Sequence, residues 1–174
     1  MAIDLKEIIW PQLGAAIDML ENAIVACPDE VWGERKHASD FWYIAFHTLF
    51  WLDFDFTPSP EEFVPQLPFG REELDPEGAL PPRTYTKTEL LTYLDHGRKK
   101  SFERIQALSD EQLRERFVVG SLDLSVAELF LYVMRHVQHH AAQLNLILRQ
   151  TTDTAPHWVK RAAPLENGRL SDNG

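Results

Sequence analysis

Apolar residues recur at spacings of three and four along two stretches near the start of the chain. The first stretch covers about residues 4–26, and Pro11 is a point where a helix could kink. The second begins near Ser39 or Asp40, either of which could cap a helix, and continues to about Asp55. The apolar positions of the first stretch are Leu5, Ile8, Ile9, Leu13, Ile17, Leu20 and Ile24. These patterns predict two long helices.

Two further helices are predicted in the second half of the chain. Thr86 and Glu89 have the spacing of a capping box and open a third helix through "LLTYLDHGRKKSFERIQAL". Ser125 and Glu128 repeat that spacing and open a fourth, which reaches about Gln150. Between them lies a short helical "SDEQLRERF", and only "RFVV" hints at a strand. The pattern predicts an all-α fold, with a four-helix bundle as the natural arrangement.

Composition and charge limit the number of domains, the cellular compartment and the kinds of partner that we expect. Its 174 residues match the usual size of one domain, so we expect a single domain, with its core in about 4–150 and a C-terminal tail in 151–174. The net charge of −10 argues against a broad nucleic-acid surface. One cysteine, Cys27, and no signal-peptide pattern fit a reducing cytoplasm. The longest apolar run, residues 41–52, is too short to cross a bilayer, so no membrane partner is expected.

Three histidines and a glutamine lie close together in the fourth predicted helix, in "HVQHHAAQ". Since each helical residue turns by about 100°, His140 lies roughly 40° from His136, and Gln143 roughly 20° away on the other side. These three positions fall in the apolar stripe that should face the core. His139 falls at the edge of the stripe, and we interpret it as a surface or interface residue.

His47 has apolar neighbours one turn away on the second helix, so it should be buried as well. A single buried histidine would be explained by hydrogen bonds to a carbonyl or a tyrosine, because an unsatisfied polar group costs about 1–3 kcal/mol. Three inward histidines, two of them spaced i, i+4, favour a metal site instead. We predict His47, His136 and His140 as ligands. Gln143 could hold a ligand or a water molecule, and a plain core contact is equally open.

The same residues resemble the DinB-like superfamily, which includes the YfiT-type proteins described as metal-dependent hydrolases. Its members carry one histidine on the second helix and an H-x-x-x-H pair on the fourth, commonly followed by a small residue and Gln. Here these are His47 in "IAFHTLFWLDF" and His136 with His140 in "HVQHHAAQL". The resemblance covers about residues 4–150, including the "CPDEVW" break and the long crossover. Ala142 stands where many relatives have Gly, a difference that concerns packing and not ligation.

The resemblance implies a down-up-up-down four-helix bundle with a three-histidine divalent metal site, usually zinc or nickel. It also implies frequent homodimers. It does not imply one reaction, because some relatives are thiol S-transferases or thiol-dependent isomerases and many have no assigned activity.

Three neutral imidazoles leave open positions on a divalent ion, which is the arrangement of a catalytic site. Such an ion could acidify a water molecule to a pKa of about 7 or deprotonate a low-molecular-weight thiol cosubstrate. A metal-dependent hydrolase or thiol S-transferase is therefore the first hypothesis, with the substrate unknown. Two others stay open: a dimeric bundle that binds a small ligand or partner, with a structural or absent metal, and a structural dimer whose histidines only form hydrogen bonds.

No catalytic residue can be named from the pattern. Asp40 is expected to cap a helix, while Asp53 and Asp55 near the end of the second helix are expected to be solvated or to support ligands. We assign His37, His96 and His157 to the surface.

Residues 57–85, which join the second and third predicted helices, hold seven of the chain's eleven prolines. They could fold over the metal pocket as a lid, with Phe63, Leu67 and Phe69 as apolar contacts. A packed loop that only bridges two helices is an equal alternative.

Overall fold

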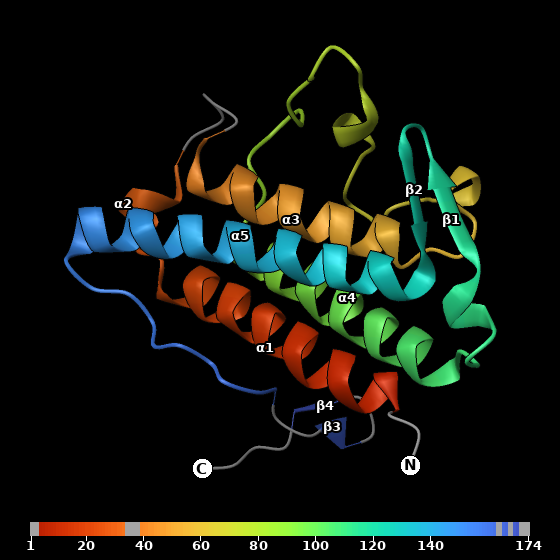
Figure 1. The fold of residues 1–174 in the computed structure, drawn as a ribbon. Helices are drawn as coiled ribbons and strands as arrows, with labels where there is room; N and C mark the ends of the chain where they lie inside the picture. Colours follow the sequence, from red (N-terminus) through yellow and green to blue (C-terminus); the bar gives the residue numbers. More distant parts are fainter. Residues whose placement is uncertain (1–3, 34–38, 163–164, 167–168, 171–174) are drawn as a thin grey trace.

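The computed structural model describes residues 4–33, 39–162, 165–166 and 169–170. Four long helices dominate it: α1 (Leu5–Ala26), α3 (Phe41–Asp55), α4 (Lys87–Ala107) and α5 (Val126–Thr152). Helix α1 packs chiefly against α4 and α5, and α3 packs chiefly against the same two helices (Figure 1). The predicted mostly helical fold is confirmed.

The helix ends follow the capping signals of the sequence. Thr86 and Glu89 form the predicted capping box at the start of α4, with both reciprocal hydrogen bonds present. Ser125 and Glu128 form the second capping box at the start of α5. Asp40 occupies the N-cap position of α3, as predicted, but its side chain makes no capping hydrogen bond. Each box provides side-chain acceptors for two backbone N–H groups at the start of the helix. The local sequence therefore specifies these two helix boundaries strongly.

Shorter elements surround the long helices. The turn after α1 contains a one-turn helix, α2 (Asp29–Trp32). Before α5, strand β1 (Arg116–Val119) pairs antiparallel with β2 (Leu122–Ser125), so the "RFVV" segment is indeed a strand. Gly120 takes a positive φ of 57° in the hairpin turn, a conformation that glycine adopts without strain. A second two-stranded pair, β3 (Leu165–Glu166) and β4 (Arg169–Leu170), lies near the C-terminus.

Helix α3 is buried on almost every side. Its apolar residues meet α4 and α5, and aromatic residues of the crossover, residues 57–85, pack against another part of it. From that crossover Phe63 and Phe69 enter the core and are 2% and 5% exposed. Phe69 stacks on Tyr93 of α4, with ring centroids 4.2 Å apart. Leu67 is 87% exposed, so the predicted apolar contact of Leu67 is wrong. The crossover holds two 3-10 turns, Pro60–Glu62 and Glu72–Leu74, and forms the arch above α3 in Figure 1.

A buried polar cluster joins α3 to α4. Asp53 is 1% exposed and accepts hydrogen bonds from the Tyr93 hydroxyl at 2.9 Å and from Lys100, and it lies 3.3 Å from His96 Nε2. Burial alone would raise the pKa of Asp53, but the bonds with His96, Lys100 and Tyr93 outweigh it and hold the pKa below its usual value. Asp53 is therefore not solvated, contrary to one of the two predicted roles.

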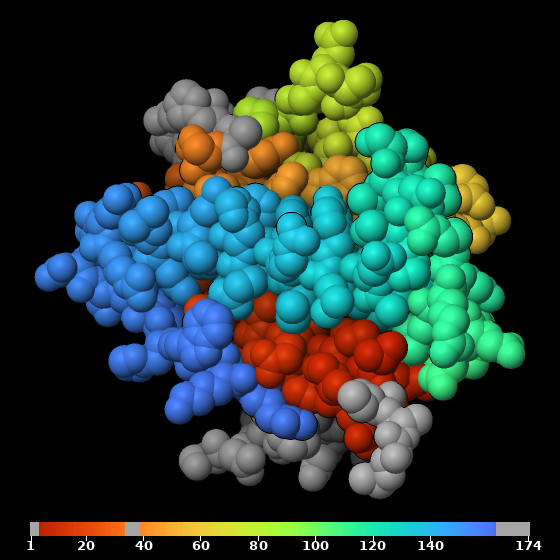
Figure 2. Space-filling model, viewed as in Figure 1, coloured from red at the N-terminus to blue at the C-terminus, as the bar shows by residue number. Residues whose placement is uncertain are grey.

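The C-terminal segment returns along α1 and forms hydrogen bonds with it. The backbone N–H of Ala162 donates to the carbonyl of Pro11 at 2.9 Å, and the Gln12 amide donates to the carbonyl of Lys160. A Cβ at Gly14 would come within 2.6 Å of the Ala162 Cβ, so glycine permits this close approach. Figure 2 shows the segment lying beside α1 on the face that α5 crosses.

Among the described residues, no helix combines the length and the apolar character needed to cross a bilayer.

Candidate metal centre

His47 from α3 and His136 and His140 from α5 converge on one point. Their candidate ligand atoms all lie within 4.8 Å of one another. The Nε2 atom of His136 is 3.3 Å from the Nε2 atom of His47 and 3.0 Å from the Nε2 atom of His140. Two imidazole ligands of a tetrahedral zinc ion, each bonded at about 2.0–2.1 Å, would be separated by about 3.3 Å. The spacing of the three nitrogens therefore suits one divalent ion.

Glu73 holds His47 in place from the crossover. Its Oε2 atom lies 2.6 Å from His47 Nδ1 and also accepts from Trp51 Nε1 at 3.0 Å. Burial works to raise the pKa of Glu73, but hydrogen bonds from His47, Tyr43 and Trp51 prevail and keep the pKa below its usual value. The carboxylate is thus ionised at neutral pH and can only accept. Carboxylates in this position orient metal-binding histidines and raise their basicity.

Gln143 makes the corresponding contact to His140. The Gln143 Oε1 atom lies 2.7 Å from His140 Nδ1, one turn along the same helix. The bond directs the remaining nitrogen of His140 toward His136. Of the two roles considered for Gln143 from the sequence, a contact to a candidate ligand is the one that the structure shows.

The proton positions implied by these contacts disfavour a purely hydrogen-bonded cluster. Glu73 and the Gln143 oxygen are acceptors, so neutral His47 and His140 carry their protons on Nδ1 and point Nε2 lone pairs inward. His136 Nε2 has at most one hydrogen to offer to these two lone pairs. Hydrogen bonds among the three rings therefore leave an unsatisfied acceptor, whereas a cation would accept all three lone pairs. The residues present fit a divalent metal ion.

Burial keeps the ligand nitrogens of α5 unprotonated. Desolvation, reinforced by the nearby His140 and His47, lowers the pKa of His136 to about 3. Desolvation also lowers the pKa of His140, although its bond with Gln143 opposes the shift. Neutral imidazole is the form that binds metals, so both rings are ready to do so at physiological pH without first losing a proton.

Two cavities open beside the histidines. One, of about 470 Å³, is bordered by His47 and His136 and lies under the β1–β2 hairpin; we call it the Asp55 cavity after the one carboxylate among its described lining residues. The other, of about 440 Å³, is bordered by His47 and His140 and by acidic residues of the crossover. A ligand could therefore reach the three histidines from either cavity.

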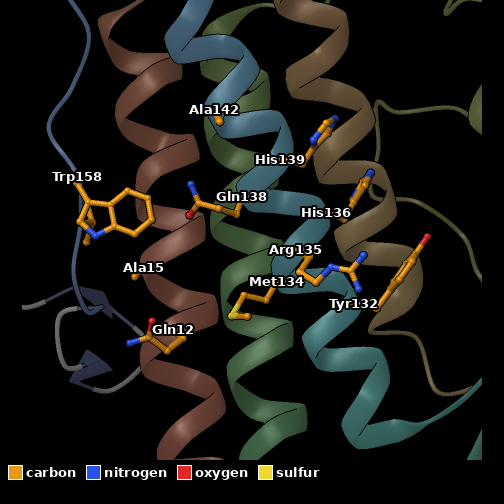
Figure 3. A pocket seen from close by; sticks show the side chains of 11 residues that line it. Gln12, Ala15, Tyr132, Met134, Arg135, His136, Gln138, His139, Ala142 and Trp158 are labelled. Carbon is orange, nitrogen blue, oxygen red and sulfur yellow. The ribbon is translucent and has the colours of Figure 1, made fainter.

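The remaining histidines, all predicted to lie at the surface, differ in their exposure. His139 is exposed and stays outside the three-histidine group, as predicted. It borders a groove of about 650 Å³ between α1 and α5, into which Trp158 of the C-terminal segment projects (Figure 3). His157 is exposed, as predicted, whereas His96 is half-buried and bonded to Asp53. His37 lies outside the described residues.

Two residues beside the site were missed or misjudged from the sequence. Glu73 was not considered, because it lies in a segment without periodicity among several other acidic residues. Asp55 was expected to be solvated or to support a ligand, yet it is 4% exposed and lines the cavity next to His47 and His136. Its position eight residues after His47 was a usable signal, because that spacing keeps both on neighbouring sectors of one helix, about 80° apart.

In a comparison with protein families, the model of the DinB superfamily matches residues 12–144. The matched region contains His47, His136 and His140, together with Glu73 and Asp55. No curated protein and no solved structure gives a significant match to the chain. The family match confirms the resemblance drawn from the histidine spacing.

Proposed function

The chain belongs to the DinB superfamily, and from this premise we propose that it is a metal-dependent enzyme whose divalent ion is held by His47, His136 and His140. The observation that carries the proposal is the convergence of three Nε2 atoms, with two of the rings held from behind by Glu73 and Gln143. Supported imidazoles with room for further ligands are typical of catalytic centres. The cavities on both sides supply that room.

The proposal includes the down-up-up-down four-helix bundle of the family, with residues 57–85 as its crossover. Its support is that each long helix packs chiefly against two of the others. The crossover contributes Glu73 to the site, which favours a role for this segment at the pocket over that of a loop that merely bridges two helices.

We propose zinc or nickel as the metal, since imidazole ligands suit both. When bound, such an ion would lower the pKa of a water molecule or of a thiol that reaches it, which is the chemistry of a hydrolase or a thiol S-transferase. The protein's own residues set the conditions for that chemistry. Glu73 and Gln143 fix the rings, and the apolar side chains of the Asp55 cavity offer contacts to a non-polar part of a substrate.

A paired screen tests the proposal. Protein reconstituted with zinc or nickel is assayed against activated esters and against small thiols with small electrophiles. We expect turnover that requires the metal, disappears on chelation, and is lost in His140→Ala. His139→Ala is the matched control, because the neighbouring ring is exposed and outside the group, and it should keep its activity. Equal turnover in His140→Ala and wild type would contradict the proposal, as would a metal that raises stability without supporting turnover of any probe.

A further inference from the structure

The Asp55 cavity has an unusual lining for a pocket beside a metal site. Four aromatic residues surround it: Trp51 and Phe54 from α3, Phe117 from β1, and Tyr132 from α5. Asp55 is the one carboxylate among the described lining residues, and none of those residues is a lysine or an arginine. A volume of about 470 Å³ is within the usual range for small-molecule sites. The cavity thus combines aromatic walls with one acidic side chain.

Among the described residues, Asp55 has no hydrogen-bond donor of the kind that a buried carboxylate normally has. It is 4% exposed, and no described group donates a hydrogen bond to its carboxylate. Arg104 of α4 is the nearest compensating charge, but its Nη1 donates to the backbone carbonyl of Asp55 at 3.3 Å. Burial raises the pKa of Asp55 to about 7, and the charge of Arg104 offsets this only in part. A buried acid without a partner is costly unless a ligand supplies one.

The histidines beside the cavity make no described bond to Asp55. The Nε2 atom of His136 faces the Nε2 atoms of His47 and His140. His47 is already paired with Glu73 on the side away from His136. A positive ligand group in the cavity would therefore meet Asp55 without a competing cation from the described lining residues.

We propose that the Asp55 cavity binds the substituted ammonium group of a small organic cation, with Asp55 as its counter-ion. Aromatic faces attract cations most strongly where water is excluded, and an ion pair with a buried carboxylate adds both affinity and selectivity. Anionic compounds are disfavoured because they would face Asp55. The inference names a substrate class for the site proposed above and rests on that function only for the claim that the bound compound reacts. Binding itself requires no metal.

Three probes of similar shape and different charge test the inference: choline, its neutral isostere 3,3-dimethylbutan-1-ol, and the anion 3,3-dimethylbutanoate. Binding to the full chain is measured by calorimetry or ligand-observed NMR, first after chelation and then on the protein as isolated. We expect choline to bind about tenfold or more tightly than the neutral isostere in both forms, and the anion to bind most weakly after chelation. Equal affinity for choline and the neutral isostere would overturn the inference.

Variants identify the groups responsible. Asp55→Asn keeps the shape and should reduce choline affinity by about tenfold or more while leaving the neutral isostere unchanged. Phe117→Leu should weaken choline more than the isostere, because it removes a ring but keeps an apolar contact. Ser121→Ala, at the same cavity, should change neither by more than about twofold. Thermal melts verify folding of each variant. An unchanged choline affinity in folded Asp55→Asn would contradict the proposal.

Two further measurements show whether a negative result concerns the proposed function or the proposed ligand. Metal content is measured on each sample, so selective choline binding by a chain that never takes up metal would refute the proposed function and leave this inference standing. Co-sedimentation with phosphatidylcholine vesicles provides the second reading. A free small cation is expected, so the protein should stay in the supernatant; sedimentation that depends on Asp55 would contradict the small-molecule assignment.

Discussion

Two polar regions lie on opposite sides of α3, and they treat buried charge in opposite ways. Toward α4, Asp53 is 1% exposed and has partners in Tyr93, His96 and Lys100. Two residues later, about 200° around the helix, Asp55 is 4% exposed and lines a cavity with no described donor to its carboxylate. The pKa of Asp53 is held below its usual value, while burial raises that of Asp55 to about 7.

From this difference we infer that the region around Asp53 serves stability and that the region beside Asp55 serves binding. Around Asp53, each charge faces a complementary group, as expected for a polar cluster that joins two helices. Beside Asp55, the Nε2 atoms of three imidazoles converge on one point, and Asp55 lines a cavity. Buried polar groups without partners lower the free energy of unfolding of the isolated chain. A ligand that bonds to them removes this cost.

The largest expected effect comes from removing the unpaired charge. The folded state raises the Asp55 pKa from 3.8 to about 7, so it binds a proton more tightly than the unfolded state. The contribution of Asp55 to the free energy of unfolding is therefore fully present below about pH 4 and is lost as the pH rises through about 7. Asp55→Asn should remove this loss and raise the free energy of unfolding at pH 8 by as much as about 4 kcal/mol. Urea unfolding of the chelated protein at pH 5 and pH 8 measures it.

The control for that prediction is the pH profile itself. The gain in Asp55→Asn should be much larger at pH 8 than at pH 5, because Asp55 of the wild type is largely protonated at the lower pH. A gain that does not depend on pH would show that Asp55 is not the titrating group.

The opposite change on the other side of α3 should destabilise the protein. Asp53→Asn leaves Lys100 without its carboxylate partner, and we expect the free energy of unfolding to fall by about 2–3 kcal/mol. This is less than for a fully buried pair, because Lys100 is partly exposed. The effect should vanish as pH falls through the depressed pKa of Asp53, since that carboxylate contributes stability only while ionised. Denaturation curves at neutral and acidic pH test both statements.

A surface pair provides the comparison for Asp53. Glu103→Gln breaks an exposed pair with Lys99 and should change stability by less than about 0.5 kcal/mol. If Asp53→Asn were equally harmless, the two polar regions would not differ in the way described above.

A smaller effect is expected where the crossover meets the histidines. Glu73→Gln removes the charge that His47 Nδ1 faces, and we expect metal affinity to fall by about 10–100-fold, equivalent to about 1.4–2.7 kcal/mol. Competition with a chelator of known affinity measures it. Glu72→Gln is the matched control in the same turn, and it should keep nearly wild-type affinity because Glu72 has no described bond to a histidine. Equal losses of metal affinity in both variants would show that the effect comes from the net charge of the crossover and not from the contact between Glu73 and His47.

The sequence predicted the helices well because their signals are local. Capping residues at Thr86 and Ser125 and the apolar spacing define α4 and α5 within one or two residues. The three histidines were also predictable, since their directions follow from helix geometry and the family pattern repeats their spacing.

Contacts made by the crossover could not be predicted in the same way. Residues 57–85 lack periodicity, so nothing indicates which acidic residue reaches His47 and which stays in solvent. Phe63 and Phe69, predicted as contacts of a lid over the metal pocket, are buried in the core and line neither cavity beside the histidines, and Leu67 is exposed. For Asp55, burial depends on how the β1–β2 hairpin and α5 close over the end of α3, which is a tertiary effect.

Metal analysis of untagged protein tests the central claim most directly. Wild type, the His47→Ala, His136→Ala double variant and the His139→Ala control are purified in parallel, and bound zinc and nickel are determined by mass spectrometry after exposure to each ion. The account predicts about one tightly bound ion per chain in wild type and His139→Ala, and none in the double variant. Equal metal content in the wild type and a folded double variant would contradict it.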